Sequence, residues 1–82
     1  MRNLIRLPQA LAATGKTRSP FYADIARGLM TAPVKLSARA VGWPEPEIAA
    51  INAARIAGLS EADIRALVQK LHADRKTQSV PA

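Results

Sequence analysis

Residues 7–43 read LPQALAATGKTRSPFYADIARGLMTAPVKLSARAVGW, and this stretch decides the fold. A first helix is predicted over residues 8–13, because proline suits a first helical turn and Gly15 suits the position that ends one. A second helix is predicted over residues 20–27, with Ser19 as its N-cap and a glycine directly after it. Two short helices joined by a tight turn are typical of a helix-turn-helix.

The end of this stretch predicts a β-hairpin. Residues 34–36 and 40–43 alternate in the manner of short strands, and residues 37–39 form the tip between them. A tip of this length can hide a bulge. Upstream, residues 1–7 are expected to form either a short edge strand or an ordered arm. With the hairpin as a wing, the sequence predicts a mostly helical fold with a small β-hairpin, namely a winged helix-turn-helix followed by C-terminal helices.

Two further helices are predicted in residues 44–75, as a scaffold or as a dimerisation surface. Pro44 opens the first of them, and Ser60 begins an acidic variant of the capping box before the second. The second has the strongest amphipathic pattern in the chain, formed by Ile64, Leu67, Val68 and Leu71. This apolar face either completes the core, which we favour, or forms a dimer interface. Residues 76–82 are expected to be a flexible tail. A chain of 82 residues has room for one domain only, so a single domain is predicted.

The charge of the chain is unevenly distributed. The net charge is +6, and residues 1–42 account for all of it, with seven basic residues against Asp24 alone. Residues 43–82 have five basic and five acidic residues and are neutral. A field of one sign on half of a small protein suits a polyanion, and nucleic acid is the commonest one. A basic protein without a polyanionic partner is the alternative.

Several other classes of protein are not expected. The chain has no cysteine, so it has no disulfide and no thiolate metal site. No apolar run approaches the roughly 20 residues of a membrane span, and Arg6, Pro8 and Gln9 interrupt what would be the apolar part of a secretory signal. His72 is a lone histidine and is expected at the surface. We expect a cytoplasmic, nucleoid-associated protein that is not an enzyme and has no catalytic residues, metal, cofactor or small-molecule ligand.

The order of motifs along the chain is that of a known family. The opening RLPQALAATGKTRS, the aromatic pair Phe21 and Tyr22, the segment APVKL at 32–36 and the segment RAVGW at 39–43 follow one another as they do in that family. The chain thus resembles the AlpA family of phage and prophage transcriptional regulators, small winged helix-turn-helix proteins related to excisionases and to the DNA-binding domain of MerR-type regulators. The resemblance implies sequence-specific binding of double-stranded DNA and regulation of transcription.

A helix-turn-helix places the N-terminal part of its second helix against base edges in the major groove, and the wing lies on the adjacent groove or backbone. The expected DNA-binding residues are Lys16, Thr17, Arg18, Ser19, Tyr22, Ala23 and Arg27 from the turn and second helix, and Lys35, Ser37 and Arg39 from the wing. Arg2 and Arg6 would add an arm contact, whereas Trp43 is expected to be a core anchor. The chain departs from the family pattern at Pro20, Ala23 and Asp24, and Asp24 is expected to put a negative charge on the reading helix.

Two other functions stay open at this point. One is an excisionase-like recombination directionality factor that bends attachment-site DNA. The other is a protein-interaction module that uses the apolar face of the last helix. A single domain with few base-reading side chains binds DNA weakly alone, so we expect a homodimer or several copies side by side on the DNA.

Overall fold

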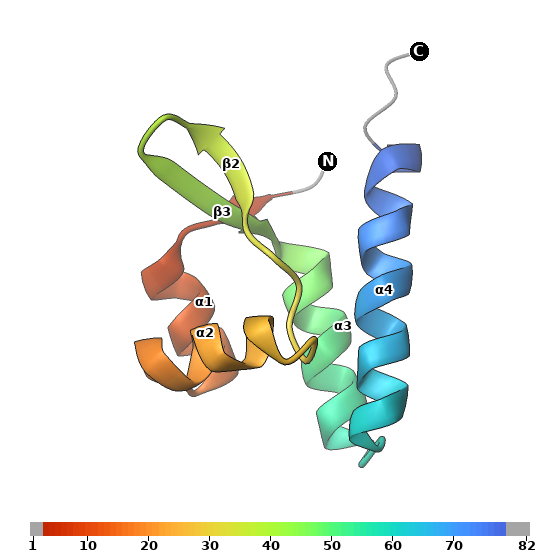
Figure 1. Cartoon of the computed structure of the whole chain (residues 1–82). Helices are drawn as coiled ribbons and strands as arrows, with labels where there is room; N and C mark the ends of the chain where they lie inside the picture. Colours follow the sequence, from red (N-terminus) through yellow and green to blue (C-terminus); the bar gives the residue numbers. More distant parts are fainter. Residues whose placement is uncertain (1–2, 79–82) are drawn as a thin grey trace.

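The computed structural model describes residues 3–78, which contain four helices and three strands (Figure 1). The helices are α1 (Leu7–Thr14), α2 (Arg18–Ala26), α3 (Glu45–Ile56) and α4 (Glu61–Gln78). The strands are β1 (Leu4–Ile5), β2 (Val34–Ser37) and β3 (Ala40–Pro44). The two short helices and the β2–β3 hairpin form one side of the molecule, and α3 and α4 stand side by side on the other. This arrangement confirms the predicted winged helix-turn-helix fold.

The three strands form an antiparallel sheet in the order β1-β3-β2. Residues Leu4 and Ile5 pair with Pro44 and Trp43, so of the two expectations for the N-terminal segment, an edge strand or an ordered arm, it forms the edge strand. The register of the hairpin shifts between Lys35 and Ser37, which is the bulge that the short tip allowed. β3 is therefore the central strand, and it joins the wing to the rest of the protein.

The start of α2 differs from the prediction. Thr17, and not Ser19, is the N-cap residue, and the helix begins two residues earlier than expected. The carbonyl oxygen of Thr17 accepts the Phe21 N–H at 3.1 Å, so Ser19 and Pro20 fall within the first turn. Proline is tolerated there because the first N–H groups of a helix have no partner within it. The glycine predicted to end α2 does so, with Gly28 at a φ of 78°.

The core lies between the sheet and the helices, and Trp43 is its centre. The indole ring is fully buried, meets the ring of Phe21 edge to face at 5.2 Å, and donates a hydrogen bond from Nε1 to the Thr31 carbonyl at 3.0 Å. This confirms Trp43 as the expected core anchor. The other buried apolar residues are Ala10, Phe21, Leu29, Met30, Ile48, Ile51, Ala54, Ile64 and Val68.

The apolar face of α4 completes this core. Ile64 and Val68 are buried, and Leu67 and Leu71 pack half-buried against the same cluster. The face is thus covered by the chain itself, which removes the surface on which the protein-interaction alternative depended. The helix continues to Gln78, so residues 76–78, which were expected in a flexible tail, are helical. Basic residues in its last turn suit the negative end of the helix dipole. Two other predictions fall outside the described residues: the arm contact of Arg2 and the remainder of the expected tail, residues 79–82.

Candidate nucleic-acid interface

The second helix of the helix-turn-helix, α2, and the wing project from the same side of the molecule. In Figure 1 the first turn of α2 and the tip of the β2–β3 hairpin both point to the left, away from α4. Phe21 and Asp24 are the buried residues of α2 and define its inner face. The outer face is formed by exposed side chains, which are Arg18, Ser19, Pro20, Ala23, Ala26 and Arg27.

Arg18 and Tyr22 form one unit at the start of α2. The guanidinium carbon of Arg18 lies 5.8 Å from the centre of the Tyr22 ring, within the range of a cation–π interaction. Tyr22 is half-buried, and its ring meets the rings of Phe21 and Trp43 edge to face at 5.9 and 6.4 Å. The aromatic core thus holds the Tyr22 ring, and the ring keeps the Arg18 charge beside the first helical turn.

The first turn of α2 also presents backbone donors. Its N-cap residue, Thr17, makes no capping hydrogen bond with its side chain, and the turn has no acidic residue. The first N–H groups of a helix point outward without a partner in the helix and lie at the positive end of its dipole. Together with exposed hydroxyls at Thr17 and Ser19, this turn has the groups that bind an anion such as phosphate.

Asp24 does not lie on the outer surface of α2, so that expectation is wrong. It follows Phe21 by three residues and therefore shares its inward face, and only 5% of the residue is exposed. Its carboxylate forms an ion pair with Lys16 and lies 3.4 Å from Arg55 Nη2. A carboxylate this buried needs such partners. Lys16, an expected phosphate contact, is consequently held against the protein.

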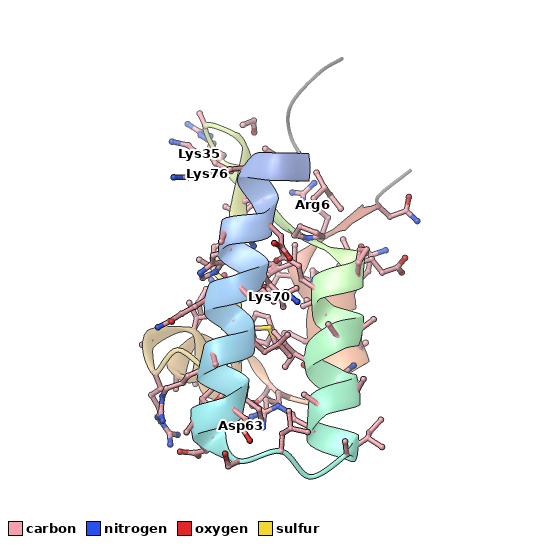
Figure 2. The ribbon with its side chains drawn as sticks, turned by 90° about the vertical axis from the view of Figure 1, so that its right-hand side faces the viewer. Arg6, Lys35, Asp63, Lys70 and Lys76 are labelled. Carbon is pink, nitrogen blue, oxygen red and sulfur yellow. The ribbon has the colours of Figure 1, made fainter. Side chains whose placement is uncertain are left out.

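The charged side chains of the wing are exposed to solvent. Lys35, Ser37 and Arg39 are all exposed, and Arg39 lies in the turn at the tip. Leu36 covers Gly42, where an added Cβ would lie 3.1 Å from Leu36 Cδ1 and from the Ile5 carbonyl oxygen. Leu36 thus packs against β3 at Gly42, whereas the polar side chains of the hairpin are exposed to solvent. Figure 2 shows Lys35 at the same end of the molecule as Lys76 in the last turn of α4.

Arg27 is set apart from the other expected residues. It is the C-cap residue of α2, at the opposite end from Arg18. Its guanidinium lies 3.4 Å from Glu61 at the start of α4, and both side chains are more than half exposed. Such a pair is screened by solvent and contributes little. The structure therefore brings the remaining α2 residues and the wing residues onto one side and places Arg27 at its margin.

The surface formed by α2 and the hairpin has no exposed carboxylate. Between Leu7 and Pro44 the sequence has a single acidic residue, Asp24, and it is buried and paired. The charges of Arg18, Lys35 and Arg39 are consequently not neutralised by an acidic side chain from this part of the chain. The field on this side is positive, as a polyanion partner requires.

Residues 3–78 contain no group of three or more histidine, cysteine or acidic residues that could hold a metal ion. Within the same residues, no helix is both long and apolar enough to cross a membrane.

His72 was expected at the surface, but the structure places it half-buried against the segment after α2. Its Nε2 accepts the Ala32 N–H at 3.0 Å. Burial lowers the pKa of His72, and the positive charge of Arg75 lowers it further, against an opposite effect of Glu47. Ala32 and Glu47 lie more than 20 residues away from His72 along the chain, so no local pattern in the sequence indicates these two contacts.

A helix-turn-helix with a two-stranded wing around one small core defines this protein as a winged helix-turn-helix protein. The family model of the prophage CP4-57 regulatory protein (AlpA) matches residues 3–56, more than half of the chain. The protein therefore belongs to the AlpA family of prophage regulatory proteins, as the resemblance implied. The match ends with α3, so α4 lies beyond it. Comparison with curated proteins found no match, and comparison with solved structures found none either.

Proposed function

We propose that this protein is a sequence-specific, double-stranded DNA-binding transcriptional regulator of the phage or prophage type, with no enzymatic activity. The first turn of α2 enters the major groove, and the β2–β3 wing lies on the adjacent groove or backbone. One observation carries the proposal: exposed basic side chains of α2 and the wing project on one side, while the single carboxylate of this region is buried. Membership of a prophage regulatory family supports it.

The residues divide into readers and positioning contacts. Arg18 reads a base edge or a phosphate, with Tyr22 beneath it. Thr17 and Ser19 meet phosphate at the helix N-terminus, and Ala23 lies where the helix approaches the bases. Additional contacts come from Lys35, Ser37 and Arg39 on the wing. Lys16 and Arg27, beside the two ends of the helix, add weaker contacts because Lys16 is paired with Asp24 and Arg27 with Glu61. Arg39 at the tip suits a narrow minor groove, where the potential is most negative.

Several copies of the protein act together at one site, as a homodimer or side by side. One α2 presents few side chains to the bases, and specific affinity for a genomic site needs more contacts than that. In this role the protein occurs in the cytoplasm in association with the nucleoid.

Binding of purified protein to its own upstream DNA tests the proposal. Fluorescence anisotropy at several salt concentrations is expected to show binding that weakens as salt increases, because bound phosphates release counterions. Arg18→Ala is expected to weaken specific binding by about 1–3 kcal/mol, or about five- to 150-fold. Lys70→Ala removes the same charge from α4 (Figure 2) and is the matched control. Wild-type protein that binds no DNA, or equal losses in both variants, would contradict the proposal.

A further inference from the structure

The segment that joins α2 to the wing is bonded to α4. We call residues 27–33 the connector, because they lead from the end of α2 to the start of β2. Figure 1 shows α4 as the helix farthest from the wing tip. Three of its side chains nevertheless form hydrogen bonds with the connector backbone. Arg65 lies near the start of α4, and His72 and Arg75 lie one turn apart in its second half.

Arg65 holds the beginning of the connector. Its Nε donates to the Arg27 carbonyl at 2.9 Å. Next to it, Gly28 has a φ of 78°, and an added Cβ there would be 3.6 Å from Arg65 Cγ. The stem of Arg65 therefore lies over the turn that ends α2, and its guanidinium binds the last carbonyl of that turn.

His72 and Arg75 hold the end of the connector. The N–H of Ala32 donates to His72 Nε2 at 3.0 Å, and the carbonyl of Ala32 accepts from Arg75 Nη2 at 2.6 Å. The backbone N–H and the carbonyl of Ala32 are thus both hydrogen-bonded to α4, two residues before β2 begins. In the middle of the connector, the Thr31 carbonyl accepts from Trp43 Nε1, so the wing strand β3 and α4 hold adjacent residues.

Arg75 is itself fixed by α3. Its Nη2 and Nε donate to the two carboxylate oxygens of Glu47 at 2.6 and 2.8 Å, and the Glu47 side chain is 4% exposed. A bidentate pair holds the guanidinium in one plane. The position at which Arg75 meets Ala32 is consequently set by the scaffold helices and not by the connector.

We infer that α4 is a brace that fixes the wing relative to the reading helix, and that Arg65, His72 and Arg75 are positioning residues of the DNA-binding unit. The consequence for DNA rests on the proposed function. The brace lies beyond residues 3–56, the part of the chain that matches the family model. Leu29, Met30 and Thr31 keep the middle of the connector in the core, so the bonds from α4 order its two ends. Without these bonds the two ends would have to be ordered when DNA binds, and ordering residues costs conformational entropy. The brace pays that cost when the protein folds, so the two reading elements meet the DNA already in place.

A charge-preserving double variant, Arg65→Lys with His72→Phe, tests the brace. The variant removes the Nε donor of Arg65 and the Nε2 acceptor of His72 and leaves the net charge unchanged. Arg75 keeps its bonds to Glu47 and to the Ala32 carbonyl. Residual dipolar couplings of backbone amides are measured first on the free protein. In the wild type, amides of α2 and of the hairpin are expected to fit one alignment tensor, whereas in the double variant the hairpin amides depart from it.

DNA affinity is measured next on the same samples. The double variant is expected to bind about five- to tenfold more weakly, because part of the ordering cost is now incurred on binding. Val68→Ala, a core change in α4 that touches no connector bond, is expected to lower the melting temperature while couplings and affinity stay those of the wild type. His72→Gln retains an acceptor for the Ala32 N–H and is expected to behave like the wild type in both measurements.

Wild-type couplings or wild-type affinity in the double variant would overturn the brace. If the double variant does not fold, the single Arg65→Lys variant is measured by the same two criteria, since it removes only one bond of an exposed side chain. Failure of the proposed function is distinguishable, because wild-type protein then binds no DNA while the couplings of the free protein still decide whether α4 fixes the wing.

Discussion

Replacing Arg75 with methionine tests the buried ion pair that joins α4 to α3. Glu47 keeps 4% of its side chain exposed and receives two hydrogen bonds from Arg75. Without Arg75, the Glu47 carboxylate stays in the protein with no cation beside it. Breaking a buried pair in this way costs about 3–5 kcal/mol. A chain of 82 residues is expected to have a free energy of unfolding of about 4–12 kcal/mol, so the variant loses a large share of its stability.

Urea unfolding followed by circular dichroism measures this loss. The double variant Glu47→Met, Arg75→Met is expected to recover most of it, because no buried charge remains, and to stay about 1 kcal/mol below the wild type for the lost Ala32 hydrogen bond. Arg27→Met breaks the exposed pair with Glu61 and is expected to cost less than about 1 kcal/mol. A loss of similar size for Arg75→Met and Arg27→Met would refute the reasoning, because it would mean that the Glu47 pair is solvated.

Three further predictions concern the core, the pH dependence and the end of α2. Trp43→Ala is expected to cost about 3–5 kcal/mol, so thermal melts should show loss of the whole fold rather than a selective loss of DNA binding. The pKa of His72 is lowered in the folded protein from its usual 6.5, so the fold favours the neutral ring. The stability that the neutral ring contributes should be complete above pH 6.5 and be lost as the pH falls through the lower folded pKa. His72→Gln should remove this pH dependence in urea titrations. Gly28→Ala should cost about 1–2 kcal/mol in the same titrations, because alanine is strained at a φ of 78°, and an unchanged midpoint would contradict the strain.

The sequence predicted the parts of the fold that local chemistry determines. Glycines end α1 and α2 at the expected residues, with φ of 71° at Gly15 and 78° at Gly28. The N–H of Asp63 is capped by Ser60 Oγ at 3.2 Å, as the motif before α4 indicated. At the start of α2 the prediction of Ser19 as N-cap was wrong: the N-cap residue is Thr17, whose side chain makes no capping hydrogen bond.

The contacts that join distant parts of the chain were not predictable. The inward position of Asp24 is not predictable from the sequence, because one of its two partners, Arg55, lies 31 residues away. The same holds for His72 and Ala32, which are separated by 40 residues, and for Arg75 and Glu47, separated by 28. A charged residue on a helix shows its inward or outward direction only when the neighbouring elements are in place.

The candidate interface was the more predictable part of the site. Arg18, Lys35 and Arg39 follow from the turn and hairpin positions that expose a side chain, and the structure leaves all three exposed. Lys16 lies in the same turn but is paired with Asp24, which no pattern of charges along the chain could indicate. Exposure thus follows from local structure, whereas pairing depends on the tertiary fold.

The central claim is that α2 and the wing together read specific DNA. It is tested most directly by a genome-wide map of the DNA that the protein occupies, with Arg18→Ala, Arg39→Ala in parallel and with Lys70→Ala as the folded control. Discrete peaks at promoters, present in the control and lost in the double variant, are the predicted result. Peaks confined to an attachment site would indicate an excisionase-like factor instead. A wild-type map without peaks, or one that the double variant reproduces, would contradict the account.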